Sequence, residues 1–290
     1  MPGYAYIVAA ALLWATLGPV ARFLLQDGVS ALEIGFWRAT IAAVLFAVHA
    51  AVRRQSWVAP RDLPAIGGFA LVGVSLFYVA FFRAVESGGA ALAAILLYTA
   101  PVWVAIAARM LLGERITTRK AITIMVTLTG VALVAGGSAD GLRSGAGARA
   151  PVGAEPLFWG LVAGLAYASY YVFGKRFFSR YEPARIFSIA MPVGALALLP
   201  MIEFTSKPAW AWALLVFIGA VPTYGACLLY AAGLARTEAT RAATIATIEP
   251  MAAAVLAFLV WEETLRPVAL AGAALILLGV VVTARARPTG

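Results

Sequence analysis

Residues 99–116 read Thr-Ala-Pro-Val-Trp-Val-Ala-Ile-Ala-Ala-Arg-Met-Leu-Leu-Gly-Glu-Arg-Ile, and residues 248–265 read Ile-Glu-Pro-Met-Ala-Ala-Ala-Val-Leu-Ala-Phe-Leu-Val-Trp-Glu-Glu-Thr-Leu. Each stretch has a proline, then a long and mostly apolar run, then a glutamate. Pro101 and Glu114 correspond to Pro250 and Glu263 at an offset of 149 positions. Self-similarity at a fixed offset is the signature of an internal repeat.

Further matches extend the repeat toward both ends of the chain. Ala-Leu-Leu-Trp-Ala-Thr at 11–16 corresponds to Gly-Leu-Ala-Tyr-Ala-Ser at 164–169, and Gly130 corresponds to Gly279. Between the halves lies a Gly/Ala-rich segment of the kind that forms flexible linkers. We therefore predict a first five-helix repeat at 1–137, a periplasmic linker at 138–155, a second five-helix repeat at 156–285 and a cytoplasmic tail at 286–290.

The composition predicts an integral membrane protein. Of 290 residues, 63% are hydrophobic and 12% are charged, and the mean hydropathy is +0.92. A soluble domain carries about twice that charged fraction, whereas a helix crosses the bilayer with roughly 20 apolar residues. Apolar runs predict ten membrane-spanning helices, at 4–24, 31–51, 64–84, 89–111, 119–137, 156–177, 184–203, 209–232, 239–261 and 266–284.

The loop charges predict the orientation. With the N-terminus in the cytoplasm, fifteen basic residues fall in inner loops and the C-terminal tail, and six fall outside. Because cytoplasmic loops carry the excess of Lys and Arg, we expect both termini in the cytoplasm of a multi-pass protein of the bacterial inner membrane. The net charge of +9 then reflects these loops, and no nucleic-acid partner is expected.

Five spans per half is an odd number, so the second half crosses the membrane in the opposite sense. Inverted repeats are commonest among secondary carriers, whose substrate site lies between the halves near the bilayer midplane. We therefore predict a carrier of small molecules.

The two proline stretches, together with Arg38–Ala39 in the second span, resemble the EamA-type members of the drug/metabolite transporter superfamily. The resemblance covers essentially 1–285, and the aromatic-rich third and sixth spans are similar to the YddG branch of amino-acid and metabolite exporters. It implies an all-α, basket-shaped fold of ten transmembrane helices with a central cavity, and transport by alternating access.

The first span departs from a related group. Small multidrug transporters use an acidic residue in their first helix to couple transport to protons, but this chain has no acid between Met1 and Asp27. The departure argues against obligatory proton antiport through such a carboxylate and leaves facilitated diffusion open.

Two prolines and two charges are candidates for gating or structure. Pro101 and Pro250 each remove a helix hydrogen bond, which predicts kinks beside the substrate site or static kinks that aid packing. Glu249 and Arg38 lie within spans, where an ionised side chain costs about 2.5–3.5 kcal/mol. Glu249 could bind a substrate amine, exchange a proton or pair with Arg38.

Aromatic and threonine side chains are candidates for substrate binding. Phenol rings deep in a span need a partner for each hydroxyl, and they predict either a cavity for aromatic side chains and planar cations or interhelical packing. Threonines at helical spacing predict a polar stripe, although threonine also bonds its own helix. The candidates are Tyr78, Phe82, Tyr98, Trp103, Tyr167, Tyr170, Tyr171, Thr244 and Thr247.

Two further features have structural interpretations. Glu114 and Glu263 lie far from the midplane, and a structural role is preferred for them, such as pairing of Glu114 with Arg115 or Arg119. Gly160 and Gly164 permit close helix approach within the bundle or between protomers, so a monomer is expected and a dimer is left open.

Other classes fit the sequence less well. No paired aspartates, Ser–His pair or HExxH motif supports an enzyme, and a single cysteine and a single histidine indicate neither a metal site nor a cofactor. We expect an exporter or uniporter of amino acids, with aromatic ones among the candidates, and of related metabolites. A drug or cation exporter, or a nucleotide-sugar or sugar-phosphate carrier, is the alternative; the last would need basic residues in the cavity, from Arg38, Lys175 or Arg176.

Overall fold

The computed structural model describes residues 2–137, 153–262 and 266–285, and within them all regular structure is helical. Nine helical segments in this part of the chain are long and apolar enough to cross a membrane, and Ala100–Leu111 is a shorter apolar helix. The protein is therefore a multi-pass membrane protein. The nine are Gly3–Gln26, Ala31–Val52, Pro60–Leu97, Thr118–Gly136, Ala154–Phe177, Pro183–Met201, Ala209–Leu234, Ala239–Trp261 and Pro267–Arg285.

Several of these segments consist of more than one helix. In chain order, the elements are α1 (Gly3–Ala15), α2 (Leu17–Gln26), α3 (Ala31–Val52), η1 (Pro60–Asp62), α4 (Leu63–Phe69), η2 (Ala70–Leu76), α5 (Phe77–Leu97), α6 (Ala100–Leu111), α7 (Thr118–Gly137), α8 (Ala154–Phe177), α9 (Pro183–Leu198), η3 (Leu199–Met201), α10 (Ala209–Gly219), η4 (Ala220–Gly225), α11 (Ala226–Leu234), α12 (Ala239–Ala246), α13 (Ile248–Trp261) and α14 (Pro267–Arg285).

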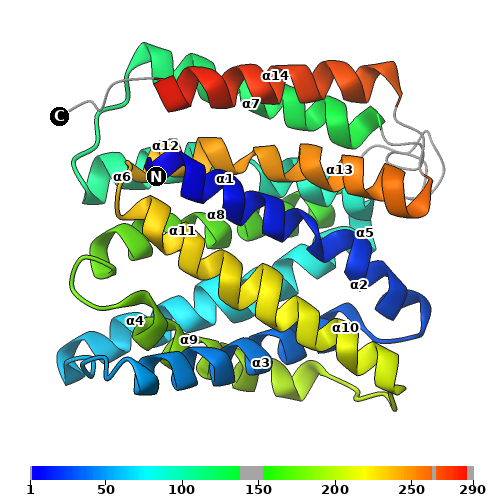
Figure 1. Ribbon diagram of the computed structural model, residues 1–290. Helices are drawn as coiled ribbons and strands as arrows, with labels where there is room; N and C mark the ends of the chain where they lie inside the picture. Colours follow the sequence, from blue (N-terminus) through cyan, green and yellow to red (C-terminus); the bar gives the residue numbers. More distant parts are fainter. Residues whose placement is uncertain (1, 138–152, 263–265, 286–290) are drawn as a thin grey trace.

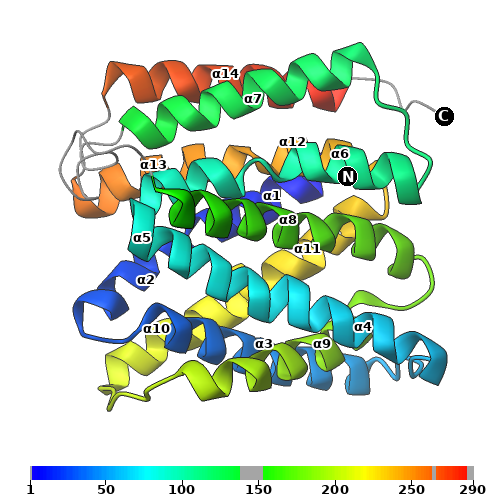
Figure 2. The same ribbon diagram turned by 180° about the vertical axis from the view of Figure 1, so that it is seen from behind.

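The helices lie side by side, so that their connections gather at two ends of the bundle (Figures 1 and 2). Helices α7 and α14 pair along one edge, and α3 and α9 pair along the opposite edge. Helices α1, α8, α12 and α13 lie between these edges. The start of α1 and the end of α14 lie at the same end, on the left in Figure 1. We call it the N/C end.

The third and fourth predicted spans are not cleanly separated. Helix α5 runs through the expected gap between 84 and 89, and only Gly89 leaves helical geometry there, with φ 80° and ψ 158°. Because a positive φ is accessible mainly to glycine, Gly89 marks a sharp kink. By length and composition, the described residues therefore give nine candidate spans where the sequence predicted ten.

Three helices are interrupted close to a proline. Helix α1 stops before Thr16, α5 stops before Tyr98, and α12 stops before Thr247. Three residues after each of these come Pro19, Pro101 and Pro250, respectively. Each proline thus lies in the first turn of a new helix, where its missing N–H is not required. The predicted kinks at Pro101 and Pro250 are observed as these helix breaks.

Two π-helical segments interrupt the third and eighth predicted spans at corresponding positions. They are η2, which begins at Ala70, and η4, which begins at Ala220. In η4, the ring of Pro222 prevents the usual bond to the carbonyl of Ile218. That carbonyl instead accepts a hydrogen bond from the Thr223 hydroxyl at 2.8 Å.

Gly160 and Gly164 allow close packing inside the bundle. A Cβ on Gly164 would lie 2.8 Å from the carbonyl oxygen of Leu96 and 2.9 Å from Oγ1 of Thr99, and a Cβ on Gly160 would overlap Leu96. The face of α8 that carries these glycines is therefore used by α5 and the α5–α6 break. The motif is accounted for without a second protomer.

Glu114 has a structural role, but the partner suggested from sequence is wrong. Its carboxylate accepts hydrogen bonds from the backbone N–H groups of Ala239 (2.7 Å) and Thr240 (3.3 Å), and from the Thr240 hydroxyl (2.7 Å). It therefore caps the N-terminus of α12, where backbone N–H groups otherwise lack partners. Its expected counterpart, Glu263, lies outside the described residues.

Candidate functional site

The α5–α6 and α12–α13 breaks bring Tyr98 and Glu249 together deep in the bundle. Glu249 lies in the first turn of α13, roughly 15 Å along the helix direction from Ala239 at 1.5 Å per residue. Its carboxylate interacts with the Tyr98 side chain. The positive end of the α13 dipole also favours a negative charge at this position. Two interrupted helices thus hold one carboxylate near the middle of the bundle.

Arg38 is held by a different set of partners. Its Nε donates to the hydroxyl of Thr223 at 3.1 Å, and its guanidinium lies 5.2 Å from the ring centre of Tyr78. The carbonyl of Ile218 fixes the Thr223 hydroxyl on its other side. The π-helical geometry of η4, which follows from Pro222, therefore orients the guanidinium.

Arg38 and Glu249 do not form a contact ion pair, which was one sequence-based alternative. In the part of the chain that the structure describes, no ion pair within 4.0 Å joins them, although they are close enough to interact electrostatically. Both side chains are half-buried. Arg38 and Glu249 thus each retain accessible surface inside the bundle. Each lies beside a different uncharged side chain, Thr223 for Arg38 and Tyr98 for Glu249.

Five aromatic rings pack against one another near these charges. Tyr167 is the hub: its ring centre lies 5.6 Å from those of Phe77 and Tyr171, 6.2 Å from that of Tyr170 and 6.5 Å from that of Trp14. We call these five residues the aromatic cluster. Apart from Trp14 and Phe77, its members were candidates from sequence.

The hydroxyl groups near the aromatic cluster are only partly satisfied by protein. Tyr171 donates to the Tyr167 hydroxyl at 3.3 Å, and Tyr230 donates to the Tyr170 carbonyl at 2.7 Å. Tyr230 is fully buried, so it acts as packing, whereas Tyr167 and Tyr170 are half-buried. The sequence left open whether the tyrosine rings line a cavity or pack between helices. Rings of both kinds occur, since Tyr230 is buried and Tyr167 and Tyr170 are partly accessible.

Three other candidates are engaged within their own helices. The Trp103 indole N–H donates to Oγ1 of Thr99 at 3.1 Å, which places it over the α5–α6 break. Thr244 and Thr247 are buried, and their hydroxyls donate to the carbonyls of Thr240 (2.9 Å) and Thr244 (2.6 Å). The structure places the threonine stripe inside helix packing and Trp103 beside the break.

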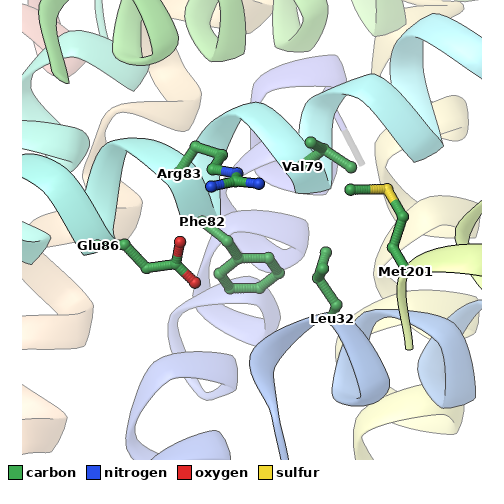
Figure 3. A pocket seen from close by; sticks show the side chains of 6 residues that line it. All are labelled: Leu32, Val79, Phe82, Arg83, Glu86 and Met201. Atoms are coloured by element: carbon green, nitrogen blue, oxygen red, sulfur yellow. The ribbon is translucent and has the colours of Figure 1, made fainter. Parts of the chain in front are cut away.

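Phe82 lies away from the aromatic cluster, in a pocket at the end of the bundle opposite the N/C end. The pocket has a volume of about 420 Å³ and is lined by Leu32, Val79, Phe82, Arg83, Glu86 and Met201 (Figure 3). The Phe82 ring stacks at 6.4 Å on that of Tyr78, which in turn lies beneath Arg38. Phe82 thus connects the pocket with the arginine.

Two residues that position the site were not singled out as candidates from sequence. Thr223 orients Arg38, and the Pro222-Thr223 pair inside an apolar run was the available signal. Trp14 packs on Tyr167 and Tyr230, and its repeat counterpart Tyr167 could have indicated it. From sequence alone, neither pattern distinguishes a residue that positions the site from one that only packs between helices.

The other basic residues considered from sequence do not join Arg38. Lys175 donates to the carbonyl of Leu234, the last residue of α11 (3.0 Å), and to that of Thr237 just after it (2.7 Å), and Arg176 is exposed. Lys175 therefore helps to close the N/C end of the bundle.

Comparison with known proteins identifies related chains. Residues 1–136 and 155–285 match the EamA-like transporter family. An uncharacterised transporter of Archaeoglobus fulgidus is 30% identical over 98% of this chain and 96% of its own length. A protein of Streptantibioticus cattleyicolor described as a probable terminal-alkyne amino-acid exporter is 28% identical over 96% of this chain and 92% of its own.

One solved crystal structure has a similar fold. It aligns with a TM-score of 0.80, covering 97% of this chain and 95% of that chain, at 19% sequence identity. At this identity the likeness concerns the fold alone.

Proposed function

The chain belongs to the EamA-like transporter family, and from this premise we propose that it is a secondary transporter, an exporter or uniporter, of amino acids and related small metabolites. Its relatives are described as transporters, which supports a membrane transporter as the general class. The amino-acid substrate, the binding residues and the transport mechanism are the proposed part.

The separation of Glu249 from Arg38 is the observation that carries the proposal. A free amino acid has one ammonium and one carboxylate on neighbouring atoms. Glu249 offers a carboxylate for the ammonium, and Arg38 offers a planar guanidinium that can bind a carboxylate through two hydrogen bonds. Because neither charge forms an ion pair with the other, binding a zwitterion breaks no existing contact ion pair.

The aromatic cluster supports a substrate with an apolar or aromatic side chain. Tyr167 and Tyr170 keep accessible surface, and they lie within electrostatic reach of Glu249 and Arg38, respectively. Aromatic faces bind apolar groups and also favour cations. Tyr78, Tyr98, Tyr167, Tyr170 and Tyr171 are proposed to line the substrate space; Thr244, Thr247 and Trp103 are proposed to stabilise the broken helices.

We further propose that the chain consists of two five-helix repeats of opposite orientation, with Gly89 between the third and fourth of ten spans. The π-helical segments and the helix breaks recur at corresponding positions of the two halves. Gly130 lies against Ile276, and their repeat counterparts Gly279 and Thr127 also lie against each other. A two-fold axis in the membrane plane predicts such reciprocal contacts.

The orientation in the membrane and the cellular location are proposed from the distribution of basic residues and from the related proteins. The connections rich in Arg and Lys lie at the N/C end of the bundle (Figure 1), which by the positive-inside rule is cytoplasmic. A bacterial relative described as an amino-acid exporter supports a place in the inner membrane. The protomer is proposed to act as a monomer.

The test is flux through purified protein in liposomes, measured with a panel of labelled amino acids with and without a pH gradient. We expect flux of apolar and aromatic amino acids, reduced about tenfold or more in Glu249→Gln, since loss of a charged hydrogen-bond partner removes about 1.5–3 kcal/mol. Glu155→Gln is the control, because Glu155 is exposed at the start of α8.

The gradient separates two mechanisms. Flux that is insensitive to pH supports facilitated transport, whereas flux that requires the gradient and disappears in Glu249→Gln makes Glu249 the coupling acid. If no amino acid is carried while planar cations or nucleotide sugars are, the amino-acid proposal is wrong and the transporter class stands.

A further inference from the structure

The pocket that contains Phe82 combines an apolar floor with two opposite charges. Leu32, Val79, Phe82 and Met201 are apolar, whereas Arg83 and Glu86 are charged and exposed. Its volume of about 420 Å³ falls within the range of roughly 300–1,000 Å³ typical of small-molecule sites. The lining is mixed, with four apolar and two charged side chains, and the pocket is open to the outside of the bundle.

The two charges face the pocket without pairing. Arg83 and Glu86 are three residues apart on α5, so they lie on one face of the helix. Among the described residues, no ion pair within 4.0 Å joins them. Figure 3 shows both charged groups on one side of the pocket and Leu32 and Met201 on the other, with the Phe82 ring between them.

We propose that this pocket is a second, outer binding site for a zwitterionic amino acid with an apolar side chain. Arg83 binds the carboxylate, Glu86 binds the ammonium, and the side chain lies against Phe82, Leu32 and Met201. A simple anion would be repelled by Glu86, and a simple cation by Arg83. The assignment rests on the proposed function, because it takes the transported substrate as the ligand.

Continuity with the aromatic cluster supports a substrate rather than an unrelated ligand. The ring centre of Phe82 lies 5.8 Å from that of Phe81, which lies 6.2 Å from that of Phe77. The Phe77 ring stacks on Tyr167 at 5.6 Å. A row of rings therefore joins the outer pocket to the proposed central site. A substrate that leaves the central site along this row reaches the outer pocket.

A phosphatidylethanolamine headgroup presents the same chemistry, an ammonium beside an anion with apolar chains attached. The pocket lies at an end of the bundle, within reach of headgroups. The experiment must therefore separate a free amino acid from a lipid.

The test is protection of an introduced thiol. Met201→Cys is made in a Cys227→Ser background, because Cys227 is the single native cysteine and Met201 is 45% exposed. Labelling by a membrane-impermeant thiol reagent is timed in liposomes with leucine, glycine, leucinamide or 4-methylpentanoate. We expect leucine, at about ten times its half-saturating concentration, to slow labelling about tenfold, and the other three to have little effect.

Variants decide whether protection is local. Glu86→Gln and Arg83→Gln should each abolish protection by leucine. Glu203→Gln and Arg266→Gln, matched exposed residues at the same end that do not line the pocket, should retain it. Protection should also persist in Glu249→Gln, where the proposed central site is impaired. Protection that survives in both pocket variants overturns the proposal.

Lipid composition decides the source of the zwitterion. Slow labelling without leucine in liposomes that contain phosphatidylethanolamine, but not in pure phosphatidylglycerol, would assign the pocket to lipid and overturn the amino-acid assignment. The two proposals can fail separately. Flux without protection by leucine overturns the outer site alone, whereas protection without flux overturns the transport proposal alone.

Discussion

Arg38 depends on a single hydroxyl for its orientation. The Thr223 hydroxyl accepts from Nε of Arg38 and donates to the carbonyl of Ile218, so it links the guanidinium to the irregular backbone of η4. A guanidinium binds a carboxylate through two bonds only when its plane is correctly oriented. Thr223 is therefore a positioning residue for the proposed carboxylate site.

Thr223→Val should keep the volume of the side chain and remove this link. We expect the KM for amino-acid flux to rise about three- to tenfold, since a typical hydrogen bond contributes about 0.5–1.5 kcal/mol, with little change in the maximal rate. Flux in liposomes measures both constants.

Thr223→Ser is the matched control, because it restores the hydroxyl and should return the KM toward the native value. An unchanged KM in Thr223→Val would show that Arg38 does not need Thr223 for its role.

At the residue scale, the sequence identified polar residues within the spans more reliably than it identified the residues that they contact. Glu249, Arg38 and the tyrosines stood out because charges and hydroxyls are costly within a span. Their partners depend on which helices meet: Arg38 contacts Thr223, which lies 185 residues away in the chain. The suggested partner of Glu114 was wrong for the same reason, since the N-terminus of α12 competes successfully for its carboxylate.

At the scale of helices, the approach of α8 to the α5–α6 break depends on Gly164. A Cβ there would lie within 3 Å of the Leu96 carbonyl and the Thr99 hydroxyl. Gly164→Ala should therefore destabilise the fold by about 1–3 kcal/mol, as overpacking does, and should lower the thermal unfolding temperature in detergent.

Gly67→Ala in α4 is the matched control. Apart from the two chain neighbours of Gly67 and the backbone of its own helix, no atom of the described residues lies within 4 Å of the place that a Cβ on Gly67 would take. Replacing a helical glycine by alanine contributes about 0.5–1 kcal/mol of stability. Equal unfolding temperatures for the two variants would contradict the packing described for α8.

The cap that Glu114 provides for α12 is a second dependence between helices. Glu114→Ala leaves the backbone N–H groups of Ala239 and Thr240 without this partner, which should cost about 0.5–2 kcal/mol, as the loss of a helix cap does. Hydrogen exchange of these two amides should accelerate. Glu182→Ala is the control, because Glu182 precedes α9 but makes no side-chain capping bond; equal acceleration at α9 would argue against a specific cap.

Helix interruptions were only partly predictable. Pro101 and Pro250 predicted kinks, and breaks occur two or three residues before them. The break at Thr16 has the same cause in Pro19. The π-helical segment η2 contains no proline, and Ser75 there donates to the carbonyl of Gly194 on α9 at 2.9 Å. The π-helical geometry of η2 therefore depends on its contact with α9, and no residue within η2 predicts it from sequence.

At the scale of the whole molecule, both ends of the described chain reach the same side of the bundle (Figure 1). If that side is cytoplasmic, green fluorescent protein fused after residue 285 should fluoresce in cells. Alkaline phosphatase fused after residue 137 should be active, because α7 ends on the other side. The reverse pattern would contradict the orientation taken from loop charge.

Apolar composition was sufficient to place most membrane spans. The predicted 31–51, 156–177 and 209–232 agree with Ala31–Val52, Ala154–Phe177 and Ala209–Leu234 within about two residues, the usual uncertainty of a helix end. The described residues give nine candidate segments rather than ten, because Pro60–Leu97 counts as one segment although two helices meet in it at the non-helical Gly89. The sequence nevertheless placed the boundary correctly, because Arg83, Glu86 and Ser87 interrupt the apolar run just before the bend at Gly89.

The pairing of α7 with α14 has a consequence for biogenesis. The backbone of α7 at Gly130 packs closely against the carbonyl of Gly272, so α7 obtains its main neighbour only when α14 has been synthesised. At ribosomal rates of about 5–20 residues per second, roughly 150 further residues take on the order of 10 s. During that interval α7 lies in the bilayer or beside the translocon, and its Gly130 face is not yet packed against α14. Membrane insertion factors that shield small-residue helix faces would therefore matter most for the middle of this chain.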